Sequence, residues 1–158
     1  MYTHKFATST GAGAYARTGL ETAIMSASPH QLLMLLFDGA KTAIGMARHH
    51  MASGEIAAKG KAISKAINII DSGIRVSFDA EAGGAIGAEL VVNMSALFDY
   101  ITERLIYANL RNDPALLDQA DRLLDTISSA WREVEPQPSH PVRQAANGAM
   151  SSRFSIGA

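Results

Sequence analysis

The sequence predicts an all-α fold, an antiparallel up-and-down four-helix bundle with a flexible or short-helical N-terminal arm. Apolar residues recur at steps of three and four along four long segments, which is the spacing of one helix face. The connections between these segments are as short as Gly54, Gly83-Gly84 and Asn112-Asp113, so neighbouring helices have to run antiparallel. No segment shows the alternating β-branched pattern of a strand, so no sheet is expected.

Composition divides the chain into three parts. Residues 1–27 form an N-terminal arm that begins as a small, polar stretch, and residues 28–136 hold the periodic segments of the helical bundle. Residues 137–158 are polar, small and aperiodic, which predicts a disordered tail. The arm also carries three aromatic rings on a segment too weak to fold alone, namely Tyr2, Phe6 and Tyr15.

The first firm helix start lies at Ser28. Ser28 can cap the helix, Pro29 suits the first helical position, where its missing N–H is harmless, and Gln31 completes a capping box. The helix therefore begins at Pro29 and runs to about Ser53. Gly54 supplies the left-handed stop.

Three further helices follow from the same signals. The second fits Glu55 to Asp79 and the third fits Ala85 to Leu110. Asp113-Pro114 repeats the combination of cap and proline and opens a fourth helix that reaches about Val134. The main apolar stripe of the second helix, which we expect to face the core, is Ile63, Ile67, Ile70, Ile74 and Phe78.

Composition and charge exclude several classes of protein. The 158 residues include no cysteine, which excludes disulfides, thiolate zinc sites and a cysteine nucleophile. Fourteen Lys and Arg against fifteen Asp and Glu give a formal charge of −1, so a nucleic-acid partner is not expected. The longest apolar run is Leu32 to Phe37, too short for a signal peptide or a stable membrane insertion. We expect a soluble, cytoplasmic protein.

Motifs for chemistry are missing. A di-iron bundle needs Glu and His at i and i+3, and no glutamate has a histidine three residues on. His49 and His50 are adjacent, so they point about 100° apart on a helix and cannot form a one-face metal pair. Gly11-Ala12-Gly13 lacks the strand and lysine of a phosphate loop. We therefore expect no catalytic residue, no cofactor and no metal, and the protein is not predicted to be an enzyme.

The first two helices carry more apolar surface than one core face requires. Small residues in these extra stripes let another helix approach closely, which predicts a groove for an amphipathic helix. Tight packing within the bundle and a homodimer face are the alternative interpretations, and the arm could cover the groove or pack at a bundle end. The groove candidates are Tyr15, Leu32, Leu35, Gly39, Ala43, Ala62, Ala66, Ile69, Gly73 and Val76.

Several short motifs follow one another along the chain in a recognisable order and spacing. They are Ala14-Tyr15, Met25–Leu32, Leu36–Ala40, Lys59-Gly60, Ser64–Asp71, Gly83-Gly84, Leu97–Tyr100, Ala108–Asp113 and Ala130-Trp131. Together these linked motifs resemble the FliS family of flagellar export chaperones. The resemblance covers about Tyr15 to Pro136, and it departs from the family at Phe37 and Phe98, where tyrosine is frequent.

The resemblance implies a cytosolic chaperone that binds the disordered C-terminal segment of flagellin. Such a chaperone prevents premature polymerisation and delivers its client to the flagellar type III export apparatus. The apolar groove fits this role, since it can hold the faces that would otherwise join flagellin subunits. The alternative hypothesis is a helical-bundle adaptor or a homodimeric regulatory protein without a flagellin client, which would use the extra stripes on itself.

Overall fold

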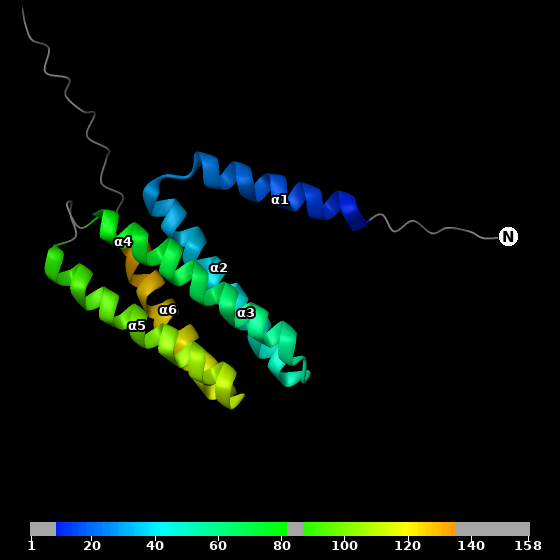
Figure 1. The fold of residues 1–158 in the computed structure, drawn as a ribbon. Helices are drawn as coiled ribbons and strands as arrows, with labels where there is room; N and C mark the ends of the chain where they lie inside the picture. The colour runs from blue at the N-terminus through cyan, green and yellow to red at the C-terminus, as the bar shows by residue number, and fades with distance from the viewer. Residues whose placement is uncertain (1–8, 82–86, 135–158) are drawn as a thin grey trace, which may run out of the picture.

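The computed structural model describes residues 9–81 and 87–134, and within these ranges the chain is helical apart from short turns. No strand occurs in the described residues, and the predicted all-α bundle is confirmed (Figure 1). The helix α1 precedes the bundle. In chain order the elements are α1 (Ser9–Ser26), α2 (Pro29–Ala52), α3 (Ile56–Ile69), the π-helical η1 (Ile70–Arg75), α4 (Val76–Glu81), α5 (Ala88–Arg111) and α6 (Pro114–Glu133).

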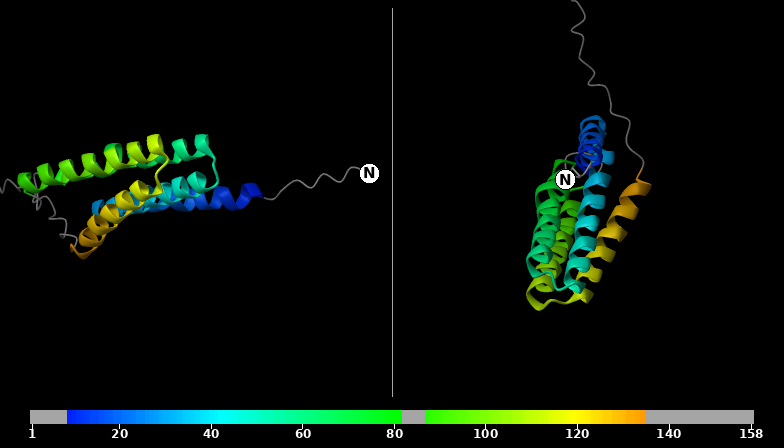
Figure 2. Two further views of the ribbon diagram at one scale, coloured as in Figure 1. Left: turned by 90° about the horizontal axis from the view of Figure 1, so that it is seen from below. Right: turned by 90° about the vertical axis from the view of Figure 1, so that its right-hand side faces the viewer.

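The bundle consists of four rods, because α3, η1 and α4 follow one another as a single rod (Figure 1). The helix α2 packs against α3 and α6, while α5 packs against α6 and against the α3–η1 rod. The four rods thus lie side by side around one core (Figure 2). The largest fully buried apolar side chains of this core are Leu33, Phe37, Ile44, Ile63, Ile70, Ile74, Phe98, Ile101, Leu105, Leu117 and Leu124.

The helix starts and stops follow the sequence signals. The Ser28 hydroxyl accepts from the Gln31 backbone N–H at 3.2 Å, and the Ser28 N–H donates to the Gln31 side chain at 3.0 Å, which is the predicted capping box. Gly54 takes the left-handed conformation after α2, with φ of 70°. The Asp113 carboxylate accepts from the Ala115 N–H at 2.9 Å at the start of α6. These boundaries are therefore decided locally, by cap chemistry.

The second predicted helix is not a continuous α-helix. Between Ile70 and Arg75 it widens into a π-helical turn, a feature that apolar spacing does not reveal. Ile70 and Ile74 stay fully buried across this turn, and Phe78 is buried beyond it. Ile67, which we expected in the core stripe, is only half-buried at the edge of the core.

Polar and aromatic contacts tie the rods together. The Arg48 Nε donates to the Asp118 carboxylate at 2.8 Å, which links α2 to α6. Near the first turn of α2, the His30 ring stacks on Trp131 with 5.6 Å between centroids, and its Nε2 lies 2.8 Å from the Trp131 carbonyl oxygen. Phe78 packs on the same indole at 5.1 Å, so three rods meet at this end of the bundle.

The N-terminal arm, which we expected to be flexible or a short helix, contains the 18-residue helix α1. The helix α1 leaves the bundle at the start of α2 and runs away from it (Figure 1). Every side chain from Gly13 to Ser26 is exposed. Tyr2, Phe6 and the predicted disordered tail at 137–158 lie outside the described residues.

Candidate functional site

The helix α2 and the α3–η1 rod approach each other closely at two glycines, Gly39 and Gly73. A Cβ on Gly39 would sit 3.6 Å from Ile69 Cδ1, and one on Gly73 would sit 2.9 Å from Leu36 Cδ2. The two helices therefore approach closely where glycine leaves room. At Gly39 and Gly73, close packing within the bundle therefore accounts for the small residue.

Three of the predicted groove residues belong to the core. Ala43, Ala62 and Ala66 are buried among the packed rods, so little of their surface is open to a partner. The physical reason is that a rod with neighbours on two sides needs an apolar arc wider than one stripe. The two stripes of α3 are thus largely one broad buried face.

A shallow cleft of about 230 Å³ nevertheless opens between α2 and α3. Ala43 and Ala62 form part of its lining together with the half-exposed Met46. Lys61 and Lys65 also line it, and both are exposed. The cleft is thus an apolar recess beside two exposed cations.

The other predicted residues are spread over several surfaces. Leu32, Leu35, Gly39, Ile69 and Gly73 are half-buried along α2, α3 and η1. Val76 is 56% exposed, on the first turn of α4 after the π-helical turn. Tyr15 is 83% exposed on α1, so its ring neither covers a groove nor packs at a bundle end.

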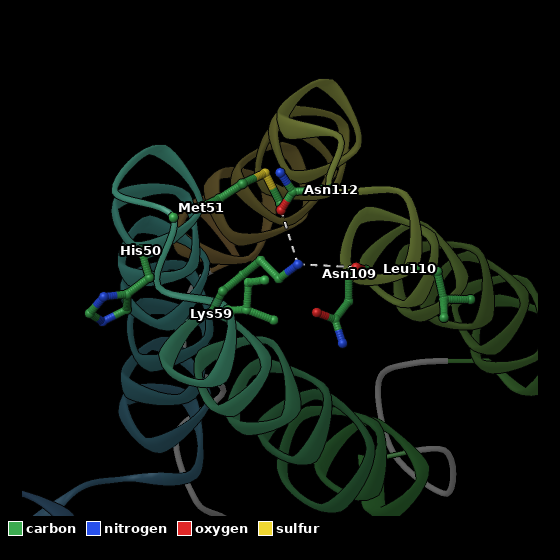
Figure 3. A pocket seen from close by; sticks show the side chains of 8 residues that line it. His50, Met51, Lys59, Asn109, Leu110 and Asn112 are labelled. Carbon is green, nitrogen blue, oxygen red and sulfur yellow. Dashed lines mark hydrogen bonds between the residues drawn. The ribbon is translucent and has the colours of Figure 1, made fainter.

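A second and larger cleft, of about 450 Å³, lies at the end of the bundle where the α2–α3 and α5–α6 turns meet (Figure 3). Its apolar lining includes Met51 from α2, Ile56 from α3 and Leu110 from α5. Ile56 and Leu110 are each more than 70% exposed. This cleft was not predicted from the sequence.

The polar part of this cleft centres on Lys59. Its side chain is almost entirely buried, and its ammonium donates to the Asn109 carbonyl at 3.2 Å and to the Asn112 side-chain oxygen at 3.0 Å (Figure 3). A sequence signal existed, because Lys59 lies four residues before Ile63 and so continues the main apolar stripe of α3. Asn112 adopts the left-handed conformation after α5, with φ of 53°.

An ion cluster ties the π-helical turn to α5. The Arg75 guanidinium donates to the Asp99 carboxylate at 2.7 Å, to the Asp71 carboxylate at 3.3 Å and to the Ser95 carbonyl at 3.3 Å. It also lies 5.9 Å from the centre of the Phe98 ring. Because all of these partners belong to η1 and α5, this cluster positions η1 against α5 and does not form a site.

The described residues contain no group of three or more His, Cys, Asp or Glu side chains that could hold a metal ion. None of the helices in those same ranges is both long enough and apolar enough to cross a membrane. The two clefts are apolar recesses beside lysine side chains, and such recesses suit the apolar face of an amphipathic peptide.

Comparison with known proteins identifies the family of the chain. The family model described as "Flagellar protein FliS" matches residues 11–138. The chain belongs to the FliS family. Its relatives include the flagellar secretion chaperone FliS of Salmonella typhimurium, which is 47% identical over 132 residues, covering 84% of this chain and 95% of the relative.

Two other FliS relatives are similar over most of their length. The flagellar secretion chaperone FliS of Escherichia coli is 43% identical over 129 residues, covering 82% of this chain and 92% of the relative. The flagellar secretion chaperone FliSB of Pseudomonas aeruginosa is 38% identical over 117 residues, covering 74% and 89%. FliS is a family of chaperones and not of enzymes.

Proposed function

We propose that this FliS protein is a cytosolic export chaperone that binds the disordered C-terminal segment of flagellin. It prevents premature polymerisation of its client and delivers it to the flagellar type III export apparatus. The observation that carries the proposal is the membership of the chain in a family of flagellar secretion chaperones. The apolar clefts of the bundle support it, since they suit the apolar face of a client helix.

The α2–α3 cleft is the proposed docking place for one client helix. Its apolar lining includes Ala43, Ala62 and Met46, and the exposed Lys61 and Lys65 stand beside it. An amphipathic helix can place small apolar residues in the recess and acidic residues beside the lysines. Ordering a flexible client costs about 2–5 kcal/mol of the gross interaction, which apolar burial has to offset.

Groove candidates that are half-buried or exposed extend this proposed surface along the rods. Leu32 and Leu35 lie on the first turns of α2, and Val76 lies beyond the π-helical turn. Binding along these residues needs no nucleotide, because burial of apolar surface alone drives it. Tyr15, on the projecting α1, is proposed to contact the client or the export apparatus from outside the bundle.

The first test is the mass of the particle in solution, measured by light scattering with and without a peptide of the flagellin C-terminal segment. We expect a monomer that becomes a 1:1 complex. A dimer whose mass stays unchanged when the peptide is added would contradict the proposal. That result would favour the alternative, a homodimeric helical adaptor without a flagellin client.

The second test addresses the place of binding. Met46→Arg fills the α2–α3 cleft and adds a third cation next to Lys61 and Lys65, so we expect weaker peptide binding at unchanged thermal stability. Gln119→Arg is the matched control, because it adds the same charge to an exposed position on α6. Equal affinities of the two variants would place the client elsewhere on the bundle.

A further inference from the structure

Lys59 is an unusual lysine for a helical bundle. Only 4% of the residue is exposed, although lysine is almost never fully buried unless it is paired. Its ammonium has three N–H donors, and two of them reach the Asn109 carbonyl and the Asn112 side-chain oxygen. Both acceptors are neutral, so these bonds satisfy hydrogen bonding without neutralising the charge.

The charge of Lys59 has no carboxylate partner within 4.0 Å among the described residues. The acidic side chains next in sequence to the cleft are engaged elsewhere. Glu55 pairs with His50, and Asp113 caps the first turn of α6. The C-terminal end of α5 offers only the partial negative charge of its last carbonyls. The cleft therefore holds a cation that is only partly compensated.

The surroundings of this cation restrict what can bind it. Lys59 lines a cleft of about 450 Å³, which lies in the range of roughly 300–1,000 Å³ that is common for small-ligand sites. Apolar side chains of Met51, Ile56 and Leu110 share the lining, so a strongly hydrated anion such as phosphate would lose water without replacement. The Asn109 side-chain amide faces the cleft and makes no hydrogen bond in the described part of the chain (Figure 3). A carboxylate next to an apolar side chain matches this set of groups.

We propose that this cleft captures the chain-terminal carboxylate of the flagellin segment, with the Lys59 ammonium as its counter-ion. The last apolar side chain of the peptide packs on Ile56 and Leu110, and the Asn109 amide donates to the second carboxylate oxygen. The inference rests on the proposed function for the identity of the client. It adds a site, a recognised chemical group and a direction in which the client lies.

A chain terminus suits this cleft better than an acidic side chain within a helix. The cleft sits at the end of the bundle, where the α2–α3 and α5–α6 turns meet. A terminus enters with its carboxylate first and needs no exit for a following residue. It also brings carboxylate and side chain on a single residue, and capture of a terminal carboxylate is a recurring mode of peptide recognition.

The experiment compares two peptides and leaves the chaperone unchanged. The flagellin C-terminal peptide is prepared with a free terminal carboxylate and with a terminal amide, and both are titrated calorimetrically into the full-length protein. We expect the amide to bind at least about 10-fold more weakly, because a charge-assisted hydrogen bond is lost. A third peptide, extended by two glycines, should bind as weakly as the amide, since its carboxylate is displaced from Lys59.

Variants of the protein then assign the effect to Lys59. In Lys59→Met the free and amidated peptides should bind alike, whereas Lys61→Met, an exposed lysine of the same helix, should keep the difference. Should Lys59→Met fail to fold, the peptide comparison on the unchanged protein decides alone. Equal binding of the free and amidated peptides would overturn the inference and leave the proposed function standing. Failure of both peptides to bind would overturn the two together.

Discussion

The helices α1 and α6 are similar in length, 18 and 20 residues, and they depend on different interactions. The helix α6 buries Leu117, Ala120 and Leu124 completely in the core and begins at the Asp113 cap. In α1 every described side chain is exposed, and the hydroxyls of Thr18, Thr22 and Ser26 bond within the helix, as Thr18 does to the Ala14 carbonyl at 2.9 Å. Helix length thus says little about stability, because most of it comes from packing of an apolar face.

The largest expected effect comes from truncating one leucine in each helix. Leu124→Ala should lower the free energy of unfolding by about 2–5 kcal/mol, since it leaves a cavity among fully buried neighbours. Leu20→Ala on α1 should change it by less than about 0.5 kcal/mol. Urea denaturation of both variants measures the difference. A comparable loss in Leu20→Ala would show that α1 packs on the bundle in solution.

Two glycines allow a second comparison, between a position where an added Cβ has room and one where it does not. Gly39→Ala should stabilise the protein by about 0.5–1 kcal/mol, because its new Cβ meets Ile69 at ordinary contact distance and alanine favours the helix. Gly73→Ala should destabilise it by about 1 kcal/mol, because Leu36 lies 2.9 Å from the new Cβ and has to move. In thermal melts the melting temperature of Gly39→Ala should lie above that of the parent protein, and that of Gly73→Ala below it. A melting temperature of Gly73→Ala at or above the parent value would mean that Leu36 moves aside freely.

The side-chain cap at the start of α6 makes a smaller contribution than the buried leucine. Asp113→Ala removes the acceptor of the Ala115 N–H and should lower the free energy of unfolding by about 1 kcal/mol. Asp113→Asn keeps an acceptor oxygen and should recover most of the loss. If the asparagine variant is as unstable as the alanine variant, the charge at the helix start matters more than the cap.

The smallest expected effect is the pH dependence of the ion pair between α2 and α6. The hydrogen bond from Lys41, followed by its positive charge, lowers the pKa of Asp125 below its ordinary value. A carboxyl group with a lowered folded-state pKa stabilises the protein above its unfolded pKa, and this contribution disappears as the pH falls through the folded pKa. The stability difference between the parent and Asp125→Asn should therefore vanish in acid; because Asp125 is exposed, it should be slight at neutral pH. A difference that persists below both pKa values would assign the effect to packing.

The sequence predicted most of the fold because helix boundaries depend on neighbouring residues. Ser28 with Gln31, Gly54 and Asp113 act within one turn of the chain, and each lies where it was expected. The π-helical turn of η1 was not predicted. Ile70 and Ile74 are four residues apart in sequence, and this separation is read as one helix face whether the turn is α-helical or π-helical. The form of the N-terminal arm was left open because its apolar residues show no sustained period.

The candidate site was harder to predict than the fold. The extra stripes on the first two helices were visible, but spacing does not tell whether a second neighbour or a partner covers them. Burial of Ala66 and the contact of Gly73 with Leu36 depend on where α2, α3 and α5 lie. Lys59 could have been noticed as a charge in line with an apolar stripe, yet its acceptors lie about fifty residues away in sequence.

The sequence by itself therefore determined the helices, their caps, the absence of thiol chemistry in the whole chain and the family of the protein. Only the tertiary structure decided which apolar residues face the core, where recesses remain and that Lys59 lies buried in one of them. The physical reason for this division is the distance along the chain over which each interaction acts. Caps and periodicity act over a few residues, whereas burial and charge compensation depend on side chains that meet only after the four rods have packed.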